Sequence, residues 1–346
     1  MVEGMPNIDA TRLEATGARI FTAMGAPEAD AVWIATLLVR ANLRGHDSHG
    51  VIRIPSYWAA VKQGWVDPKS PVTIIEETPV IARLDGGRGF GQPVARRGMQ
   101  MAIAKARSAG LSAVTLCNTS HVGRLADYAE MAAREGFVAL LWVNAVHGLN
   151  VAPWGGAARR LGTNPHCVAV PGADGPAMVL DFATSVVAEG KMRVKRNRKQ
   201  QAPLGWFIDA EGRPNTDPEV FYGTPPGSLL PAGDHKGYGL SLAVEILGGI
   251  LSGTGPAGPD AGPLENGTLM ICLDVARFLP PSEFEKQVGV LFDWVKSAPL
   301  AQGATEVLIP GEPEARLEAE RRRDGIPIED ETWSQIEGVA RELGVS

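Results

Sequence analysis

The segment 44–57, RGHDSHGVIRIPSY, gathers side chains that could move protons and bind anions. If a helix restarts near Ser48, then His49, Arg53 and Tyr57 follow one another at four-residue spacing and share one face. Arginine binds a carboxylate bidentately, and histidine exchanges a proton near neutral pH. The pattern therefore favours reduction of a 2-oxo acid, with Arg53 holding the acid. A capping turn in which His49 is only hydrogen-bonded explains the same spacing.

The same segment also offers ligands for a metal ion. His46, Asp47 and His49 are residue types that would suit a metal-dependent hydrolase or lyase. No further ligand follows nearby, so we expect no metal. Activity that a chelator abolishes and that needs no nicotinamide would favour this alternative.

A second polar cluster, NTSHVGR over 118–124, follows an apolar run and precedes a helical pattern. A residue between the end of a strand and the start of a helix lies at the sheet edge where α/β proteins usually bind ligands. His121 is therefore a second acid/base candidate or a cofactor contact. A helix-capping turn is the simpler interpretation of the same residues.

Four polar segments have the composition that phosphate and ribose groups require. GTNP over 162–165 and DFATS over 181–185 bring backbone and hydroxyl groups to the ends of apolar runs. GDHKGYG over 233–239 opens an apolar helix, whose N–H groups and lysine suit an anion. PGEP over 310–313 turns into a helix, where the glutamate could cap it or meet a ribose hydroxyl. An ordinary turn is the simpler interpretation of GTNP and DFATS, and an ordinary helix cap explains the other two segments as well.

Two further patterns carry weaker signals. The run KMRVKRNRK over 191–199 is typical of a solvated charged loop; a cofactor 2′-phosphate site is the second interpretation and a nucleic-acid module the third. The G-x-G-x-x-G match at Gly253, Gly255 and Gly258 follows a helix and is interrupted by prolines. A dinucleotide fingerprint must follow a strand and open a helix, so we do not interpret these glycines as a Rossmann site.

Composition indicates a globular protein of roughly two domains at about 150 residues per domain, since the chain has 346 residues and is 45% hydrophobic. The net charge of −6 disfavours general binding to nucleic acid. Cys117, Cys167 and Cys272 lie far apart, and the N-terminus lacks a signal-peptide core, so we predict a cytoplasmic protein. No apolar run approaches the roughly 20 residues that span a bilayer.

Helical periodicity dominates both ends of the chain, whereas short Val- and Ile-rich runs alternate with helices in the middle. This order predicts an α/β fold with a mixed sheet. We expect a helical domain built from residues 1–75 and 313–346, flanking an α/β cofactor-binding domain over 76–312.

Taken together, the motifs resemble the type 2 malate/L-lactate dehydrogenase family, which is unrelated to the Rossmann lactate dehydrogenases. The resemblance rests on RANLRGHDSHGVIRIPSY, TSHVGRLADYAE, APWGG, LGTNP, DFATSVVAEGK and HKGYGLSLAVEILGG, in this order along the chain. ENGTLMICLD, FDWVKSAP, IPGEPE and DGIPIEDETW most resemble the bacterial hydroxycarboxylate dehydrogenase B branch.

The resemblance implies an NAD(P)-dependent 2-hydroxycarboxylate dehydrogenase, non-Rossmann in fold, without a metal and usually dimeric with its site at the subunit contact. It implies His49 or His121 as the acid/base, with Ser48 and Asp181 as a relay to His49, and Arg53 with Tyr57 around the substrate. The implied NAD or NADP contacts are Thr163, Asn164, Asp181, Ala183, Thr184, Ser185, His235, Lys236, Gly237, Gly311 and Glu312.

Reduction of a cyclic imino acid is an alternative within the same chemistry, since it would need the same arginine and proton donor. The pattern does not separate NAD from NADP or one 2-oxo acid from another.

Overall fold

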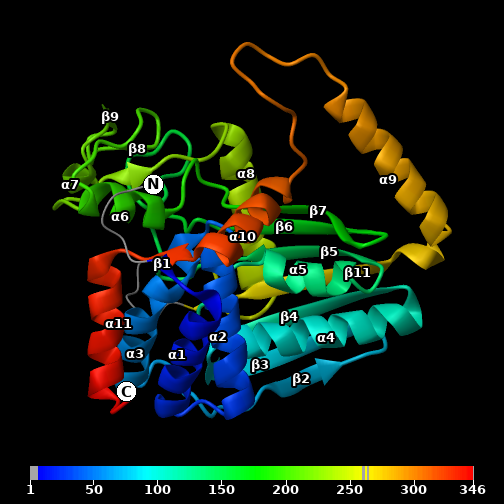
Figure 1. The fold of residues 1–346 in the computed structure, drawn as a ribbon, viewed down its shortest axis with the longest axis horizontal. Helices are drawn as coiled ribbons and strands as arrows, with labels where there is room; N and C mark the ends of the chain where they lie inside the picture. The colour runs from blue at the N-terminus through cyan, green and yellow to red at the C-terminus, as the bar shows by residue number, and fades with distance from the viewer. Residues whose placement is uncertain (1–6, 259–261, 263–264, 346) are drawn as a thin grey trace.

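The computed structural model describes residues 7–258, 262 and 265–345. Residues 1–6 lie outside the described residues. The prediction that the chain lacks a signal peptide rests partly on them. A seven-stranded sheet in the order β2-β3-β4-β11-β5-β6-β7 forms the centre of the molecule (Figure 1). Its strands are β2 (Thr73–Glu77), β3 (Ile81–Gly89), β4 (Leu111–Thr119), β11 (Thr268–Asp274), β5 (Phe137–Val143), β6 (His166–Gly172) and β7 (Gly175–Phe182).

The sheet is mixed, because β3 and β4 run parallel and every other neighbouring pair runs antiparallel. The predicted mixed α/β fold is confirmed. A Rossmann crevice requires several adjacent parallel strands, which this strand order does not contain. The segment Gly253–Gly258 follows the π-helical segment η3 (Glu245–Ile250) rather than a strand, as its sequence indicated.

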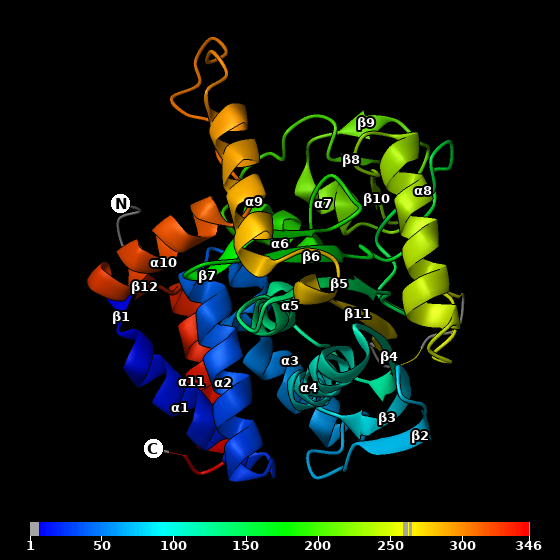
Figure 2. The same cartoon turned by 90° about the vertical axis from the view of Figure 1, so that its right-hand side faces the viewer.

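Two helices cover one face of the sheet (Figure 2). They are α4 (Gly91–Ala109) and α5 (Ala126–Ala133), and their small apolar side chains pack closely against buried strand residues such as Leu116 and Leu141. Gly98 marks the closest approach, since a Cβ there would lie 2.8 Å from Leu116 Cδ2. The other face carries α8 (His235–Val244) and η3.

A helical layer lies beside the sheet and draws on both ends of the chain (Figure 1). It contains α1 (Ala10–Ala23), α2 (Glu28–Leu43), α3 (Ile54–Lys62) and α11 (Asp330–Glu342). The short strands β1 (Asn7–Ile8) and β12 (Ile326–Pro327) pair antiparallel and join the two ends. A buried cluster that includes Phe21, Leu38 and Ile336 fills the space between these elements.

A third apolar cluster, which includes Met192, Phe207 and Leu229, supports an outlying unit that lies in the chain between β7 and α8. Its elements are α6 (Glu189–Asn197), α7 (Pro218–Phe221) and the small sheet of β8 (Phe207–Ile208), β9 (Pro214–Asn215) and β10 (Ser228–Leu229). The favoured interpretation of the basic run 191–199 as a loop is wrong over most of its length, because these residues form helix α6. Glu189 pairs with Arg193 one turn later, which offsets charge repulsion along the helix.

Two C-terminal helices differ in how they pack. α10 (Glu312–Asp324) lies across the end of α2, whereas α9 (Pro281–Lys296) projects from the body (Figure 1) and has no buried residue. Among the described residues, no helix is long and apolar enough to cross a membrane.

A buried cluster of charged side chains joins the helical layer to the sheet domain. Glu130 on α5 is 1% exposed and pairs with Arg40 at 2.9 Å, Arg124 at 3.3 Å and Arg134 at 3.0 Å, and it also pairs with Arg44. Because buried charges are stable only when they are paired, these contacts fix α2 against α5.

Replacing Glu130 with Ala leaves Arg124 buried with one carboxylate fewer. We expect Glu130→Ala to lower the free energy of unfolding by about 3–5 kcal/mol, measured by urea denaturation. The matched control is Glu135→Ala, because Glu135 pairs with Arg107 at the surface and such a pair contributes about 1 kcal/mol or less. Equal losses for the two variants would contradict this account.

Candidate active site

The segment after α2 does not form the continuous helix that its spacing suggested. Two short turns, η1 (Asp47–His49) and η2 (Val51–Arg53), precede α3, and Gly50 separates them in an extended conformation. The Asn42 Oδ1 accepts the Val51 N–H at 2.9 Å, and a Cβ on Gly50 would lie 2.1 Å from that oxygen. The side chain of Asn42 thus fills the space that any side chain at position 50 would need.

The turns nevertheless bring the predicted side chains together with His121, which follows the end of β4. The His49 and His121 rings lie 5.5 Å apart between centroids, and the Tyr57 hydroxyl lies 2.7 Å from His121 Nδ1. The Ser48 hydroxyl lies 3.0 Å from His49 Nδ1. Arg53 is held in place because its Nε donates to the Ser48 carbonyl at 2.7 Å.

An aromatic cluster backs this group of residues. Tyr57 packs near Phe21 and Phe90, with ring centroids 6.1 and 6.0 Å away. Gln92, at the start of α4, donates from Nε2 to the Tyr57 hydroxyl oxygen at 2.8 Å and is fully buried. Gln92 was not among the residues predicted from the sequence. The one indication there was a polar residue near the start of an apolar helix.

Burial controls the protonation of the two histidines. Burial, together with the positive charge of Arg53, lowers the pKa of His49 to about 3. The same causes and the neighbouring His49 lower the pKa of His121 well below its usual value. Burial raises the pKa of Tyr57 to about 12. At neutral pH the site therefore holds one cation, Arg53, beside two neutral imidazoles and a neutral phenol.

Asp181 lies apart from His49. Its Oδ2 accepts the Ala126 N–H at 2.8 Å, and among the described residues no hydrogen bond joins it to His49. The structure thus contains the Ser48 half of the predicted relay and not the Asp181 half. Burial raises the pKa of the Asp181 carboxyl, against the lowering effect of the Ala126 amide and Arg124.

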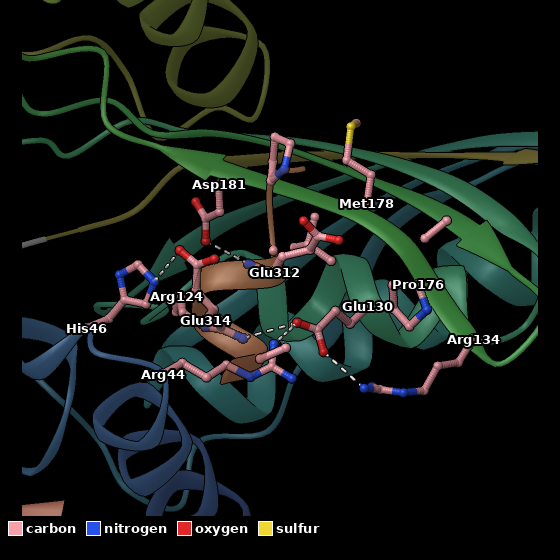
Figure 3. Close-up of a pocket in the computed structure, with 16 residues that line it drawn as sticks. Arg44, His46, Arg124, Glu130, Arg134, Pro176, Met178, Asp181, Glu312 and Glu314 are labelled. Carbon is pink, nitrogen blue, oxygen red and sulfur yellow. Dashed lines mark hydrogen bonds and ion pairs between the residues drawn. The ribbon is translucent and has the colours of Figure 1, made fainter. Parts of the chain in front are cut away.

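Asp181 instead lines a cavity of about 240 Å³ between β7, α5 and the start of α10 (Figure 3). Gly311 and Glu312 line the same cavity, so three predicted cofactor contacts meet here. Gly311 has φ +101°, and a Cβ there would lie 3.2 Å from the Val179 backbone nitrogen. Glu312 accepts the Ile309 N–H at 2.9 Å and pairs with Lys296.

The remaining predicted cofactor residues form a second group around Thr184. The Thr184 N–H and hydroxyl both donate to the Thr163 carbonyl, at 2.9 and 3.1 Å. Gly237 packs against the same turn, since a Cβ there would lie 2.5 Å from the Thr184 carbonyl oxygen. His235 and Lys236 are exposed at the start of α8, beside this turn, whereas Ala183 is half-buried.

Two residues of this group face inward. Asn164 is fully buried, and its Nδ2 donates to Glu245 Oε1 at 2.8 Å and to the Ser241 hydroxyl at 2.9 Å. Ser185 is also buried, and its hydroxyl donates to the Val187 carbonyl. Their side chains shape the turns from within.

His46 and Asp47 contact α10 rather than His49. His46 Nε2 lies 3.7 Å from Glu314 Oε1, as Figure 3 shows, and Asp47 pairs with Arg321 at 2.8 Å. No group of three or more metal-type ligands occurs among the residues that the structure describes. These contacts do not support the metal-dependent alternative.

Fold and site together describe an α/β protein in which a half-buried arginine lies beside two neutral histidines, an arrangement that suits anion binding and proton exchange. The malate/L-lactate dehydrogenase family model matches residues 8–337. The chain is 38% identical to hydroxycarboxylate dehydrogenase B of Escherichia coli K12 over 351 residues, covering 99% of this chain and 96% of that protein.

Solved structures of other proteins share the fold of this chain. A putative malate/lactate dehydrogenase from E. coli aligns with a TM-score of 0.94 at 37% identity, covering 99% of this chain and 96% of that one. A delta1-piperideine-2-carboxylate reductase from Pseudomonas syringae aligns with a TM-score of 0.82 at 29% identity, covering 97% and 100%.

The chain belongs to the malate/L-lactate dehydrogenase family, as the motifs indicated. Malate and lactate are both 2-hydroxycarboxylates, so this membership makes the chain a 2-hydroxycarboxylate dehydrogenase that uses a nicotinamide cofactor.

The depressed histidine pKa values predict a pH-dependent stability. His49 and His121 stay neutral in the folded protein and take up protons near pH 6.5 in the unfolded chain. Their contribution to the free energy of unfolding is therefore complete above that pH and is lost as the pH falls. Between pH 7.5 and 5.5 each should cost about 1.4 kcal/mol of unfolding free energy. His49→Gln should reduce this loss in urea titrations, whereas His235→Gln, at an exposed position, should retain it. A wild-type protein equally stable at both pH values would contradict the prediction.

Proposed function

We propose that this enzyme interconverts a 2-oxo acid and its 2-hydroxy acid, with Arg53 as the carboxylate anchor. The observation that carries this proposal is a half-buried arginine beside two neutral histidines that forms no ion pair with a carboxylate among the described residues: Arg53 donates to a carbonyl, the Ser48 oxygen. An arginine without a carboxylate partner can receive that of the substrate, and its fixed Nε leaves the two terminal nitrogens for a bidentate contact.

The described residues fit a nicotinamide cofactor. The Thr184 turn, the exposed start of α8 and the cavity beside Gly311 offer N–H groups, a lysine and close backbone approach, which phosphate and ribose groups require. One part of the cofactor would be held by Thr163, Thr184, Gly237, His235 and Lys236. Another part of it would be held by Asp181, Gly311 and Glu312. When bound, NAD(H) or NADP(H) supplies or accepts the hydride at C2 of the acid.

We assign proton exchange to His121. Asp181 has another partner, which removes one of the two predicted partners of His49 and leaves Ser48 as the other. His121 Nδ1 is fixed by Tyr57, so Nε2 is the nitrogen available to the substrate oxygen. Tyr57 then acts through His121 rather than as a wall of the substrate pocket. A substrate carboxylate on Arg53 would offset the positive charge that depresses the histidine pKa and would help His121 to take up a proton.

Reduction of a cyclic imino acid is the second candidate, because a reductase of that type shares the fold at 29% identity. Its substrate also carries a carboxylate for Arg53. NADH and NADPH oxidation against pyruvate, oxaloacetate, 2-oxoglutarate, phenylpyruvate and Δ1-piperideine-2-carboxylate separates the two and also determines cofactor preference.

Replacing Arg53 with Met should remove the bidentate contact and misorient the acid at the transition state. We expect Arg53→Met to lower kcat/KM by about 1,000-fold, with effects on both KM and kcat, in the NAD(P)H oxidation assay. Arg107→Met, at a surface ion pair, is the control and should retain wild-type kinetics. Unchanged kinetics of Arg53→Met with every 2-oxo acid tested would overturn its role as anchor.

We further propose that the enzyme is a cytoplasmic homodimer. Its three cysteines are free and buried, which suits a reducing compartment. On α9, Val290, Leu291 and Trp294 are 63%, 55% and 76% exposed, and on η3 Ile246 is 55% exposed. Apolar surface of this extent marks an interface, and a second copy of the chain offers the same apolar patches in return.

A charge on this surface should prevent association. We expect wild-type protein to have twice the mass of one chain by light scattering after gel filtration, and Trp294→Glu to shift it to the monomer. Gln335→Glu adds the same charge on α11 and should remain dimeric. A wild-type monomer at micromolar concentration would contradict the proposal.

A further inference from the structure

A chain of hydrogen-bonded side chains runs from Gln92 on α4 through Tyr57 to His121; Gln92 and Tyr57 are buried and His121 is half-buried. Gln92 Nε2 donates to the Tyr57 oxygen at 2.8 Å, and that oxygen lies 2.7 Å from His121 Nδ1. Gln92 is 0% exposed and Tyr57 is 8% exposed. Water is therefore kept from both, and each must find its hydrogen-bond partner within the chain.

The direction of the first hydrogen bond determines the second. Because the Tyr57 oxygen accepts from Gln92, its O–H is free to donate to His121 Nδ1. Nδ1 then carries no proton, so the proton of the neutral imidazole is on Nε2. Meanwhile Gln92 Oε1 is buried and has no hydrogen-bond partner among the described residues.

The proposed reaction also needs the opposite arrangement, in which the proton of the neutral His121 ring is on Nδ1. For reduction, the Nε2–H bond of a protonated His121 breaks, its electron pair stays on Nε2, and an O–H bond forms at the substrate oxygen. His121 then keeps its other proton on Nδ1, which must donate to Tyr57. The Tyr57 O–H now needs an acceptor elsewhere, and Gln92 Oε1 becomes that acceptor if the amide turns by half a rotation.

We propose that Gln92 is a positioning residue that, through Tyr57, sets which ring nitrogen of His121 carries the proton. This inference rests on the proposed role of His121 in proton exchange. A glutamine suits the task because its amide offers a donor and an acceptor to the same neighbour. The unpartnered Oε1 is then the acceptor held for the second half of the reaction.

The other groups around His121 do not determine which ring nitrogen carries the proton. The hydrogen bonds from Gln92 through Tyr57 therefore do so. The groups that face His121 are Arg53 from η2, His49 from η1 and Tyr57 from α3, and Tyr57 in turn interacts electrostatically with Tyr128 from α5. Arg53 and His49 both disfavour a second proton on His121 and do not distinguish the two neutral tautomers by contact. Tyr57 is the side chain in hydrogen-bond contact with the ring.

Gln92→Glu is the direct test, because a carboxylate accepts and does not donate. It should hold the Tyr57 O–H toward residue 92, place a proton on His121 Nδ1 and favour the doubly protonated ring. We expect the acidic pKa in the kcat–pH profile to rise by about one unit or more. Ring ¹⁵N NMR of the ligand-free protein should show His121 changing from Nε2–H to Nδ1–H, with its signal assigned by His121→Gln.

Gln100→Glu is the matched control, since it adds the same charge on an exposed face of α4. It should leave the pH profile and the NMR signals unchanged. Gln92→Met, an uncharged variant of similar size, should fold and lose about tenfold in kcat together with the Nε2–H preference. Retention of the Nε2–H tautomer in both Gln92 variants, or an unshifted profile in Gln92→Glu, overturns the proposal.

The two proposals fail in different ways. Absence of NAD(P)H-dependent activity in the wild type with every acid tested overturns the proposed function. The NMR measurement needs no substrate, so it decides the role of Gln92 in either case.

Discussion

The buried pairing of Glu130 with arginines from the helical layer and from the sheet region is the interaction on which the site depends. Arg40 lies in the last turn of α2, Arg44 directly follows that helix, and Arg124 lies in the loop that follows His121. One carboxylate therefore holds both chain segments that carry the histidines. Because a buried charge is stable only with its partners, this contact makes the relative position of the two segments a condition of folding.

The site itself is organised around the charge of Arg53, which forms no ion pair with a carboxylate among the described residues. Because Arg53 is half-buried beside two neutral histidines, a carboxylate at this position would be favoured. The same burial keeps the two histidines and Tyr57 neutral until such an anion arrives. Under the proposed function, substrate binding and proton uptake would be coupled through electrostatics.

The cofactor arrangement differs in kind from a Rossmann site. There, one glycine-rich turn at the start of one helix meets the pyrophosphate. Here the candidate contacts come from β7, the start of α8 and the start of α10, and they converge because β6–β7 pairing and the Thr163–Thr184 hydrogen bonds bring distant turns together. Glycines at 237 and 311 permit the close backbone contacts.

The sequence by itself determined the α/β class, most of the long elements and the chemical residue types, because periodicity and local composition report burial and turns. Motifs identified His49, Arg53 and His121 as candidates. The tertiary structure determined which groups these side chains contact by hydrogen bonds. Asn42 in the preceding helix accepts the Val51 N–H beside the break at Gly50, Asp181 accepts the Ala126 N–H and has no hydrogen bond to His49 among the described residues, and Gln92 on α4 donates to Tyr57 on α3. Hydrogen bonds between residues far apart in the chain depend on packing, which no local pattern records.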